Sequence, residues 1–378
     1  MKNSRRSFLQ TAAAAAGVTL IPTDTYSTLV NATPRALRDD RMKFTFRPYT
    51  IELKHPFTIS VLSRTTTPVM LTEVEYSGIV GYGEASMPPY LGESHETATA
   101  FLSKVDLSKY ENPFELETIL SDIDALAPGN PAAKASVDIA LHDLIGKILN
   151  KPWYDIWGFD KKKAPNTTFT IGIDKPDVVR QKVKEAVGFK ILKVKLGRDN
   201  DKEMIETIRS LTDVPLTVDP NQGWKDKNYA LDMAHWLKDR NVKYIEQPLP
   251  KEMVDEIAWL TERSPLPILA DEGFQRLSDL RKIPGTYNGI VVKLMKSTGL
   301  REAHTMVMLA RALDLKIMLG CMVETSCAVT AASHLSPMVN WADLDGNLLI
   351  TNDVFDGMKV IDGKVTIPDR PGIGVIKL

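Results

Sequence analysis

Ile191-Leu192-Lys193-Val194-Lys195-Leu196-Gly197 places two lysines in an otherwise apolar run that lies between Gly188 and Gly197. An apolar run of this length bounded by glycine predicts a buried parallel strand. Residues i and i+2 of a strand point to the same face, so Lys193 and Lys195 share one face inside a core. A buried lysine is costly unless carboxylates accompany it. We therefore expect the carboxylates that accompany these lysines elsewhere in the chain.

Charged residues end the next four apolar runs. The run 215–218 is followed by Asp219, the run 242–245 by Glu246, the run 267–270 by Asp271 and the run 289–292 by Lys293. Counted from Lys193, the successive intervals are 26, 27, 25 and 22 residues, which is about the length of one strand–helix unit. Charged side chains at the ends of successive parallel strands are typical of the catalytic rim of a barrel of the TIM type.

The fold class that follows is α/β, with two domains in a chain of 378 residues. A (β/α)7β modified TIM barrel is expected over residues 165–350. It follows an N-terminal α+β capping domain over residues 41–150, which the segment 353–378 completes. In the capping domain, alternating patterns predict antiparallel strands over 42–53 and 69–76, and helical patterns follow over 94–105, 114–126 and 131–149. The eight barrel strands are expected at residues 168–173, 191–197, 215–219, 242–246, 267–271, 289–294, 316–319 and 341–345.

Two capping-domain loops, 60–68 and 86–93, have two interpretations. They are either ordinary surface connections or lids over the barrel mouth, where specificity commonly resides.

Composition and the N-terminus bound the functional class. A net charge of −1 with 25% charged residues argues against a nucleic-acid or polyanion partner.

Residues 1–32 contain the twin-arginine pattern Ser4-Arg5-Arg6-Ser7-Phe8 and an apolar run at 11–22, which predicts an export signal with a cleavage site near 30–32. An ordinary N-terminal tail is the alternative. Export by the twin-arginine route would place the protein in the periplasm or cell envelope, and no later run is long enough to predict a membrane span.

The two cysteines, Cys321 and Cys327, do not make a disulfide framework, and both are interpreted as small core residues. The sequence allows a homo-oligomer and leaves the oligomeric state open.

The three acids Asp219, Glu246 and Asp271 are expected to converge on one side of the barrel mouth. Carboxylates at such close range cannot all stay ionised without a cation. An all-oxygen site suits a hard ion, so we expect Mg²⁺, one per subunit. The six histidines fall on predicted helices or in the first domain, which disfavours zinc. A network of salt bridges with the lysines and no metal is the alternative.

Two lysines are candidates for acid–base chemistry. Lys195 and Lys293 end strands on opposite sides of an eight-stranded barrel and can flank one substrate carbon from its two faces. A nearby cation and a second ammonium group lower a lysine pKa towards neutrality, where the lysine can act as a general base. The alternative for Lys293 is a rim lysine paired with an acid, and Lys296 is expected to be more exposed.

These parts predict the inversion of a stereocentre by proton transfer. A substrate carboxylate would bind at the metal, one lysine would remove the proton from the adjacent carbon, and the other would return a proton on the opposite face. Lys193 and the metal would stabilise the enediolate between the two steps.

At this point the motifs resemble a known family. Lys193-Val-Lys195, Asp219-Pro-Asn221-Gln222-Gly223-Trp224, Glu246-Gln247-Pro248, Ala270-Asp271-Glu272 and Lys293-Leu-Met-Lys-Ser-Thr-Gly299 are similar to those of the enolase superfamily, muconate-cycloisomerase-like branch, over about residues 42–378. The mandelate-racemase-like branch would have a histidine near the end of strand 7, where this chain reads Leu319-Gly320-Cys321-Met322. Pro220 stands where the branch usually has alanine, and it lacks only a backbone donor.

The resemblance extends to a dipeptide epimerase of the L-Ala-D/L-Glu kind. Asp343-Leu344-Asp345 resembles the acid pair that holds the free α-ammonium of a dipeptide in that group, and two such carboxylates suit a cation. Solvated acids at a strand end are the alternative. Other residues that the resemblance places around the substrate are Lys193, Arg64, Tyr90, Cys321, Met322 and Glu324.

Several functional questions stay open at this stage. The rival activities are an o-succinylbenzoate synthase or cycloisomerase of the same branch, whose substrates lack an α-ammonium, and a secreted binding barrel with no turnover. The sequence leaves undecided the preferred dipeptide, for which L-Ala-D-Glu from murein in the cell wall is a candidate. It also leaves open the oligomeric state and the role of Arg64.

Overall fold

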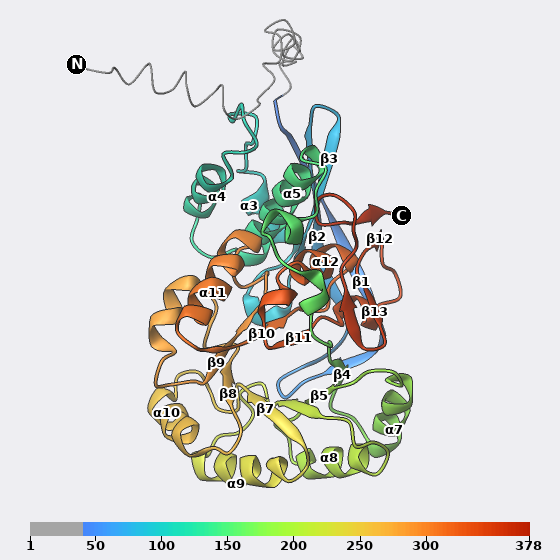
Figure 1. Ribbon diagram of the computed structural model, residues 1–378, viewed down its shortest axis with the longest axis vertical. Helices are drawn as coiled ribbons and strands as arrows, with labels where there is room; N and C mark the ends of the chain where they lie inside the picture. The colour runs from blue at the N-terminus through green and yellow to red at the C-terminus, as the bar shows by residue number, and fades with distance from the viewer. Residues whose placement is uncertain (1–40) are drawn as a thin grey trace, which may run out of the picture. The chain divides into compact units, whose positions relative to one another are not determined.

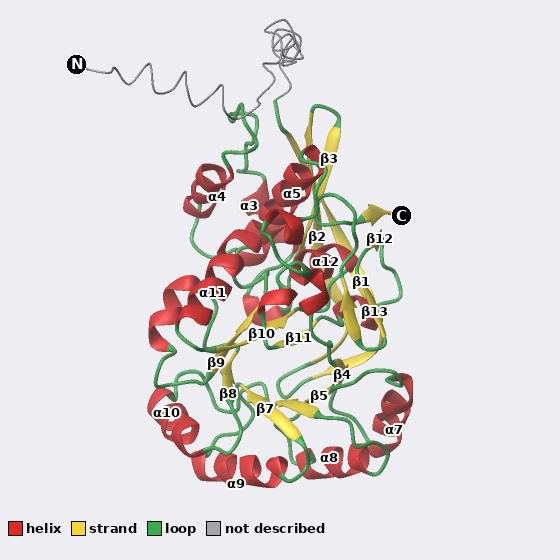
Figure 2. Ribbon diagram, in the orientation of Figure 1, coloured by secondary structure: helices red, strands yellow, loops and turns green. Residues whose placement is uncertain are grey.

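The computed structural model describes residues 41–378 and joins an antiparallel sheet with helices to a parallel barrel (Figures 1 and 2). The sheet is a meander of β1 (Lys43–Thr58), β2 (Ser63–Tyr76) and β3 (Ile79–Ser86). It is followed by the short η1 (Pro89–Leu91) and by α3 (His95–Leu102), α4 (Leu116–Ala125) and α5 (Pro131–Ile148). Ser94 caps α3, because its side chain accepts from the backbone N–H of Thr97 while the Thr97 side chain accepts from the backbone N–H of Ser94.

The expected loop 60–68 is largely strand. β1 continues to Thr58 and β2 begins at Ser63, so only residues 59–62 turn between the two strands. The threonines of the sequence Thr65-Thr66-Thr67 are β-branched and suit a pleated strand, and Thr66 and Thr67 pair with Glu52 and Ile51. The register shifts between Glu52 and Phe57, and beyond that irregularity Phe57 is the cross-strand partner of Arg64.

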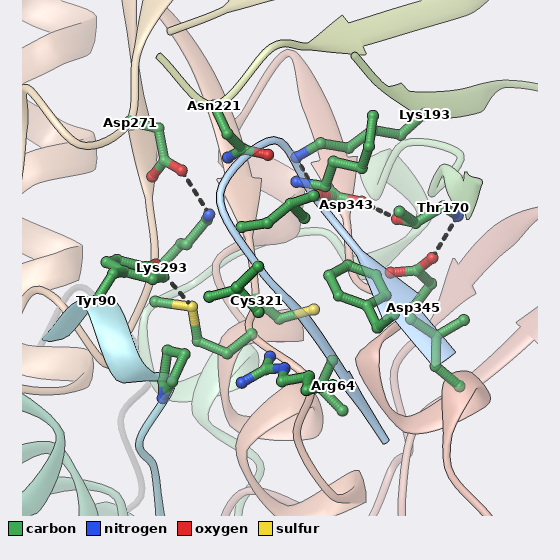
Figure 3. A pocket seen from close by; sticks show the side chains of 18 residues that line it. Arg64, Tyr90, Thr170, Lys193, Asn221, Asp271, Lys293, Cys321, Asp343 and Asp345 are labelled. Atoms are coloured by element: carbon green, nitrogen blue, oxygen red, sulfur yellow. Dashed lines mark hydrogen bonds and ion pairs between the residues drawn. The ribbon is translucent and has the colours of Figure 1, made fainter. Parts of the chain in front are cut away.

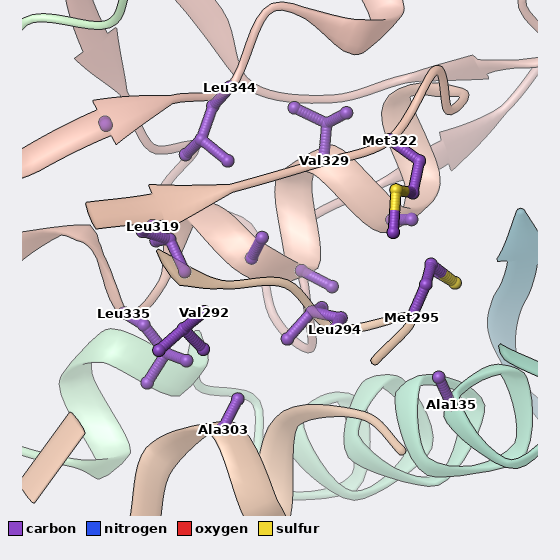
Figure 4. Close-up of a cluster of buried hydrophobic side chains, with 14 of the residues drawn as sticks. Ala135, Val292, Leu294, Met295, Ala303, Leu319, Met322, Val329, Leu335 and Leu344 are labelled. Atoms are coloured by element: carbon purple, nitrogen blue, oxygen red, sulfur yellow. The ribbon is translucent and has the colours of Figure 1, made fainter. Parts of the chain in front are cut away.

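Helix α5 packs directly against β3 and ties the sheet to the barrel. A side chain at Gly83 would lie 1.9 Å from the carbonyl oxygen of Ser136, so only glycine allows this approach. Asp138 of the same helix accepts from the backbone N–H groups of Leu300 and Arg301, at 2.6 and 3.2 Å. The apolar core is continuous from α5 to the barrel strands and the helices behind them (Figure 4).

Eight parallel strands form the barrel in chain order: β4 (Phe169–Ile171), β5 (Leu192–Lys195), β6 (Leu216–Asp219), β7 (Val242–Glu246), β8 (Ile268–Ala270), β9 (Gly289–Val292), β10 (Lys316–Gly320) and β11 (Trp341–Asp343). A parallel bridge between Thr167 and Ala342 joins the last strand to the first. All eight expected strands are present, and this confirms the (β/α)7β fold class.

The connections between these strands are α7 (Pro176–Glu185), α8 (Asp201–Arg209), α9 (Lys227–Lys238), α10 (Val254–Arg263), η3 (Leu277–Lys282), α11 (Leu300–Ala312) and α12 (Ser326–Ser333). The fifth connection is a 3₁₀ helix, whereas the others are α-helices. Between α5 and the barrel lie α6 (Trp153–Ile156) and η2 (Lys161–Lys163), and η4 (Ser336–Met338) and η5 (Gly346–Leu349) flank β11.

The C-terminal segment forms β12 (Phe355–Asp356), β13 (Lys359–Ile361), β14 (Lys364–Thr366) and β15 (Ile376–Lys377). The hairpin of β13 and β14 lies against residues 165–167, just before the first barrel strand. Lys377 forms an ion pair with Glu73 of β2, and Ile373 donates its backbone N–H to Asp143 of α5. The export signal expected at residues 1–32 and its cleavage site lie outside the described residues. Within residues 41–378, none of the helices combines the length and the apolar character that crossing a membrane requires.

Candidate active site

Three buried acids meet at the C-terminal ends of neighbouring strands. Asp219 and Glu246 are the last residues of β6 and β7, and Asp271 follows β8. One carboxylate oxygen from each lies within 4.8 Å of the other two. The convergence follows from the fold, because parallel strands of a barrel bring their carboxyl ends to one rim.

Lys193 and Lys195 of β5 lie on one side of this triad. Lys193 Nζ is 2.7 Å from Glu246, 2.8 Å from Asp343 and 3.3 Å from Asp219. Burial lowers the pKa of Lys193, but these carboxylates outweigh burial and hold its pKa well above the usual value. Lys195 Nζ donates to Asp219 at 2.6 Å.

Lys293 approaches the triad from the opposite wall. Its strand β9 is four strands from β5 in the closed barrel, and Lys293 Nζ donates to Asp271 at 2.8 Å. Lys195 and Lys293 therefore pair with different ends of the triad. Burial lowers the pKa of Lys293, but Asp271 and then Tyr90 and Glu246 outweigh it and raise this pKa well above the usual value. The low lysine pKa expected from the sequence is not found for Lys293 here.

The expectation that Lys296 is exposed is wrong. Lys296 is buried, and its Nζ donates to the backbone oxygens of Asp271 and Val291, at 2.8 and 3.1 Å, and to the Asp271 carboxylate. The physical reason is a tight turn after β9, in which Lys296 N donates to the Lys293 carbonyl and directs the chain back under the rim. Lys296 thereby fixes Asp271 from behind.

The electrostatics of the three acids differ. Burial raises the pKa of Asp219, but the ammonium groups of Lys195 and Lys193 outweigh it and lower this pKa. Burial also raises the pKa of Asp271, and there Lys293 and Lys296 outweigh it. Burial, with Asp219 next to it, raises the pKa of Glu246 to about 8. Within the described residues, neither carboxylate oxygen of Glu246 receives a hydrogen bond of good geometry, although Lys193 lies close.

These observations fit a bound divalent cation. The site offers three buried carboxylates, and both oxygens of Glu246 lack a hydrogen-bond donor in the described part of the chain. Hard cations such as Mg²⁺ prefer all-oxygen ligands.

Residues in left-handed backbone conformation shape the rim. Asn221, Gln222 and Gln247 follow their strands with φ of 45°, 64° and 37°. Asn221 donates its backbone and side-chain N–H groups to Asp219, at 2.9 and 3.2 Å. Gln247 Oε1 accepts from Asp271 N at 3.1 Å. Such backbone strain is common where a fold holds reacting groups in place.

Asp343, the last residue of β11, lies beside Lys193, and Asp345 lies next to Thr170 (Figure 3). Asp343 also accepts from Thr168, and Asp345 accepts from Thr170 N at 2.6 Å. Lys193 outweighs burial and lowers the pKa of Asp343, whereas burial and Asp343 raise the pKa of Asp345 to about 7. The two carboxylates line the cavity together and are buried, so they are not solvated acids at a strand end.

Side chains from the first sheet reach over the barrel mouth (Figure 3). Arg64 of β2 and Tyr90 of η1 line the same cavity as the lysines. Burial lowers the pKa of the Arg64 guanidinium, and its buried Nε and Nη1 atoms have no hydrogen-bond partner among residues 41–378. Tyr90 donates its hydroxyl to Met322 Sδ at 3.0 Å. Both segments interpreted as lids thus contribute to the cavity wall.

The segment after β10 is placed only partly as expected. Cys321 and Met322 line the cavity, but Glu324 does not. Glu324 is buried behind the wall, and its Oε1 accepts from Met322 N at 3.0 Å. Glu324 therefore supports the segment instead of facing a substrate, because the turn after β10 directs its side chain back to its own backbone.

Several contributing residues were not predicted from the sequence. Thr168 and Thr170 hold the acid pair, and Phe57, Ile59 and Leu62 line the cavity. Thr168 and Thr170 are spaced by two on the first barrel strand, next to the strand that carries Asp343 and Asp345, and this spacing was an available signal. For Phe57 the signal was absent, because its place depends on the irregular register of β1.

Comparison with known proteins agrees with this arrangement. A family described as mandelate racemase / muconate lactonizing enzyme, N-terminal domain, matches residues 42–158, and one described as enolase C-terminal domain-like matches residues 177–376. The chain is 62% identical over 339 residues to the L-Ala-D/L-Glu epimerase of Bacteroides thetaiotaomicron, covering 89% of this chain and 88% of that protein. It is 35% identical to the L-Ala-D/L-Glu epimerase of Escherichia coli, covering 83% and 96%.

Solved structures are similar over the same range. A substrate-liganded L-Ala-D/L-Glu epimerase from Bacillus subtilis matches with a TM-score of 0.84 and 27% identity, covering 89% of this chain and 99% of that one. A dipeptide epimerase from Enterococcus faecalis complexed with Mg and the dipeptide L-Leu-L-Tyr matches with a TM-score of 0.81 and 30% identity, covering 89% and 99%.

Proposed function

This chain belongs to the mandelate racemase/muconate lactonizing enzyme family of the enolase superfamily, and we propose that within it the protein is a dipeptide epimerase, an isomerase. The proposed reaction inverts the Cα next to the C-terminal carboxylate of an L-Ala-D/L-Glu-like dipeptide. Similarity to named epimerases over nearly the whole described chain supports the reaction class.

The observation that carries the mechanism is the placement of Lys195 and Lys293. They lie on opposite walls of one cavity and pair with opposite ends of the acid triad. One lysine removes the α-proton from one face of the substrate, and the other delivers a proton to the opposite face. Lys193, held between three carboxylates, is the fixed positive charge next to the enediolate oxygens. This two-base, 1,1-proton transfer inverts the stereocentre.

We propose one Mg²⁺ per subunit, held by Asp219, Glu246 and Asp271. When bound, it supplies positive charge that stabilises the carboxylate of the substrate as negative charge develops there. Sharing Asp271 with a cation would weaken the pull of that carboxylate on the Lys293 ammonium. The pKa of Lys293 would then fall towards the working range of a general base.

Two charged sites support a dipeptide of the L-Ala-L-Glu kind. Asp343 and Asp345 form a buried acidic pair that suits the free α-ammonium. On the cavity wall, Arg64 presents buried N–H groups that have no partner among residues 41–378, and these suit the side-chain carboxylate of glutamate. Tyr90, Cys321 and Met322 complete the substrate wall, with Glu324 behind it.

The test is a dipeptide library incubated with the protein and Mg²⁺ in D₂O and read by mass spectrometry and chiral chromatography. Deuterium uptake and epimer formation are expected for L-Ala-L-Glu and L-Ala-D-Glu. Absence of both, with the protein folded, would reject the proposal.

Two other functions are less well supported. An o-succinylbenzoate synthase or a cycloisomerase would leave Asp343 and Asp345 without a cationic partner, because those substrates carry no α-ammonium. A secreted binding barrel without turnover would have no use for two lysines on opposite walls. Turnover of a substrate without an α-ammonium, with no epimerisation of any dipeptide, would favour the synthase or the cycloisomerase.

We also propose that residues 1–32 are a twin-arginine export signal, so that the mature protein works in the periplasm or cell envelope on murein peptides. The motif at Arg5 and Arg6 is the support. Replacing both arginines with lysine should retain the protein in the cytoplasm on cell fractionation, and unchanged export would contradict the assignment.

We further propose that the chain divides into two domains. One is a capping domain at 41–150, completed by 353–378, and the other is a catalytic barrel at 165–350.

A further inference from the structure

A second cavity lies directly behind one wall of the active site. It measures about 340 Å³, and apolar side chains from the irregular part of β1, from β4 and from the segments next to them make up most of its lining. Lys54, His55, Lys182 and Glu185 also line it, but His55 is paired with Glu185 and Lys182 with Asp174. Phe57, Thr170 and Leu349 line both this cavity and the active-site cavity. These three residues are therefore the partition between the two spaces.

The partition stands at the end of the site where a dipeptide would place its N-terminal residue. Asp345 accepts from the backbone of Thr170 at 2.6 Å, so the acid pair touches the partition itself. An α-ammonium held by Asp343 and Asp345 is one bond from the Cα of the N-terminal residue. The side chain on that Cα then projects into the cavity that Phe57 and Leu349 also line.

Phe57 owes its position to the irregularity in β1. Pairing with β2 is lost after Glu52 and resumes at Phe57, which is the partner of Arg64. Irregular strand segments of this kind re-aim a side chain. Here the result is that Phe57 faces the barrel mouth, while residues 53–56 line the second cavity.

From this arrangement we propose that Phe57 and Leu349 restrict the N-terminal residue of the substrate to a small side chain, and that the second cavity is a latent subsite for a larger apolar one. The inference rests on the proposed epimerase function and adds its N-terminal specificity. Beyond the partition, Phe169 and Phe189 pack with their ring centroids 5.0 Å apart and provide apolar surface. An aliphatic or aromatic side chain is therefore the chemical class that the second cavity accepts.

The experiment compares L-Ala-L-Glu with L-Leu-L-Glu and L-Phe-L-Glu for the full-length protein and for Phe57→Ala and Leu349→Ala. Phe189→Ala is the matched control, because it removes an aromatic ring from the second cavity without opening the partition. Thermal unfolding of each variant confirms that it is folded, and two partition variants are included in case one is not.

The expected result is a wild-type protein that prefers the alanine dipeptide. In either partition variant, the ratio of kcat/KM for the leucine dipeptide to that for the alanine dipeptide rises about tenfold or more, since one methylene accommodated or excluded is worth about 10–200-fold. Phe189→Ala leaves the ratio unchanged. The ratio is used because Phe57 also lies over the Arg64 guanidinium, at 5.9 Å, and its loss lowers turnover of both substrates together.

Two results would overturn the inference while leaving the epimerase function in place. One is a folded partition variant that still turns over L-Ala-L-Glu without any gain on the larger dipeptides. The other is a wild-type protein that already turns over the larger dipeptides as well as L-Ala-L-Glu. A wild-type protein that epimerises no dipeptide would reject the proposed function itself, and the specificity inference with it.

Discussion

Replacing Arg64 with methionine should raise stability and lower activity at the same time. The guanidinium of Arg64 has buried Nε and Nη1 atoms that lack a partner among residues 41–378, and burial lowers its pKa. Its neighbour on the sheet, Phe57, offers only a ring face at 5.9 Å. Such a cation is desolvated before the substrate arrives, and methionine fills a similar space without a charge.

The magnitudes follow from the unpaired groups. A buried donor without a partner costs about 1–3 kcal/mol, so Arg64→Met should raise the free energy of unfolding by roughly 1–2 kcal/mol. For a chain of this length the midpoint of thermal unfolding would rise by a few degrees. Loss of a buried charge pair with substrate costs about 2–5 kcal/mol, which lowers kcat/KM for L-Ala-L-Glu by about 30-fold to a few thousand-fold.

The assay is epimerisation of L-Ala-L-Glu and of L-Ala-L-Met by wild type, Arg64→Met and the charge-preserving control Arg64→Lys, together with calorimetric unfolding. The methionine dipeptide should lose little, because it makes no pair with Arg64. A variant that keeps its preference for the glutamate dipeptide and is less stable than wild type would refute this reasoning about Arg64.

Three further results are expected. In a denaturant titration, Lys296→Met should lower the free energy of unfolding by about 3 kcal/mol, because it breaks a buried ion pair with Asp271. The control Lys282→Met removes an exposed ion pair and should cost under about 1 kcal/mol. Burial raises the pKa of Glu84 from 4.5 to about 7, so the native state binds this proton more tightly than the unfolded state. The protonated carboxyl contributes roughly 3 kcal/mol of stability, which is present below pH 4.5 and is lost as pH rises through 7. Glu84→Gln should therefore flatten the fall in stability between pH 5 and 8. Removal of Mg²⁺ by a chelator should abolish epimerisation and lower the unfolding temperature, and added Mg²⁺ should restore both. In Glu246→Gln, added Mg²⁺ should leave the unfolding temperature nearly unchanged, because one of the three carboxylates is missing.

The barrel and its charged rim could be predicted from the sequence because each charged residue directly ends an apolar run. Asp219, Glu246 and Asp271 needed only the rule that parallel strands bring their carboxyl ends together. The opposite placement of Lys195 and Lys293 followed from counting strands in a closed barrel. These predictions depend on strand periodicity and order, which are properties of the local sequence.

The parts that the sequence could not predict depend on turns and on contacts between distant segments. The orientation of Lys296 is set by a turn after β9, where strand alternation no longer applies. Glu324 folds back on Met322, and Phe57 owes its place to a register shift in β1. The low pKa expected for Lys293 assumed a cation as its nearest charge, whereas in this structure its nearest charge is the Asp271 carboxylate.

The proposed mechanism depends most on the two lysines acting from opposite faces of one carbon. The most direct measurement follows α-proton exchange by NMR in D₂O, with each pure epimer of Ala-Glu offered separately to Lys195→Ala and to Lys293→Ala. Each folded variant should lose epimerisation yet still exchange the α-proton of one epimer, and the two variants should differ in which epimer that is. Exchange of the same epimer by both variants, or undiminished epimerisation by either, would contradict a two-base mechanism.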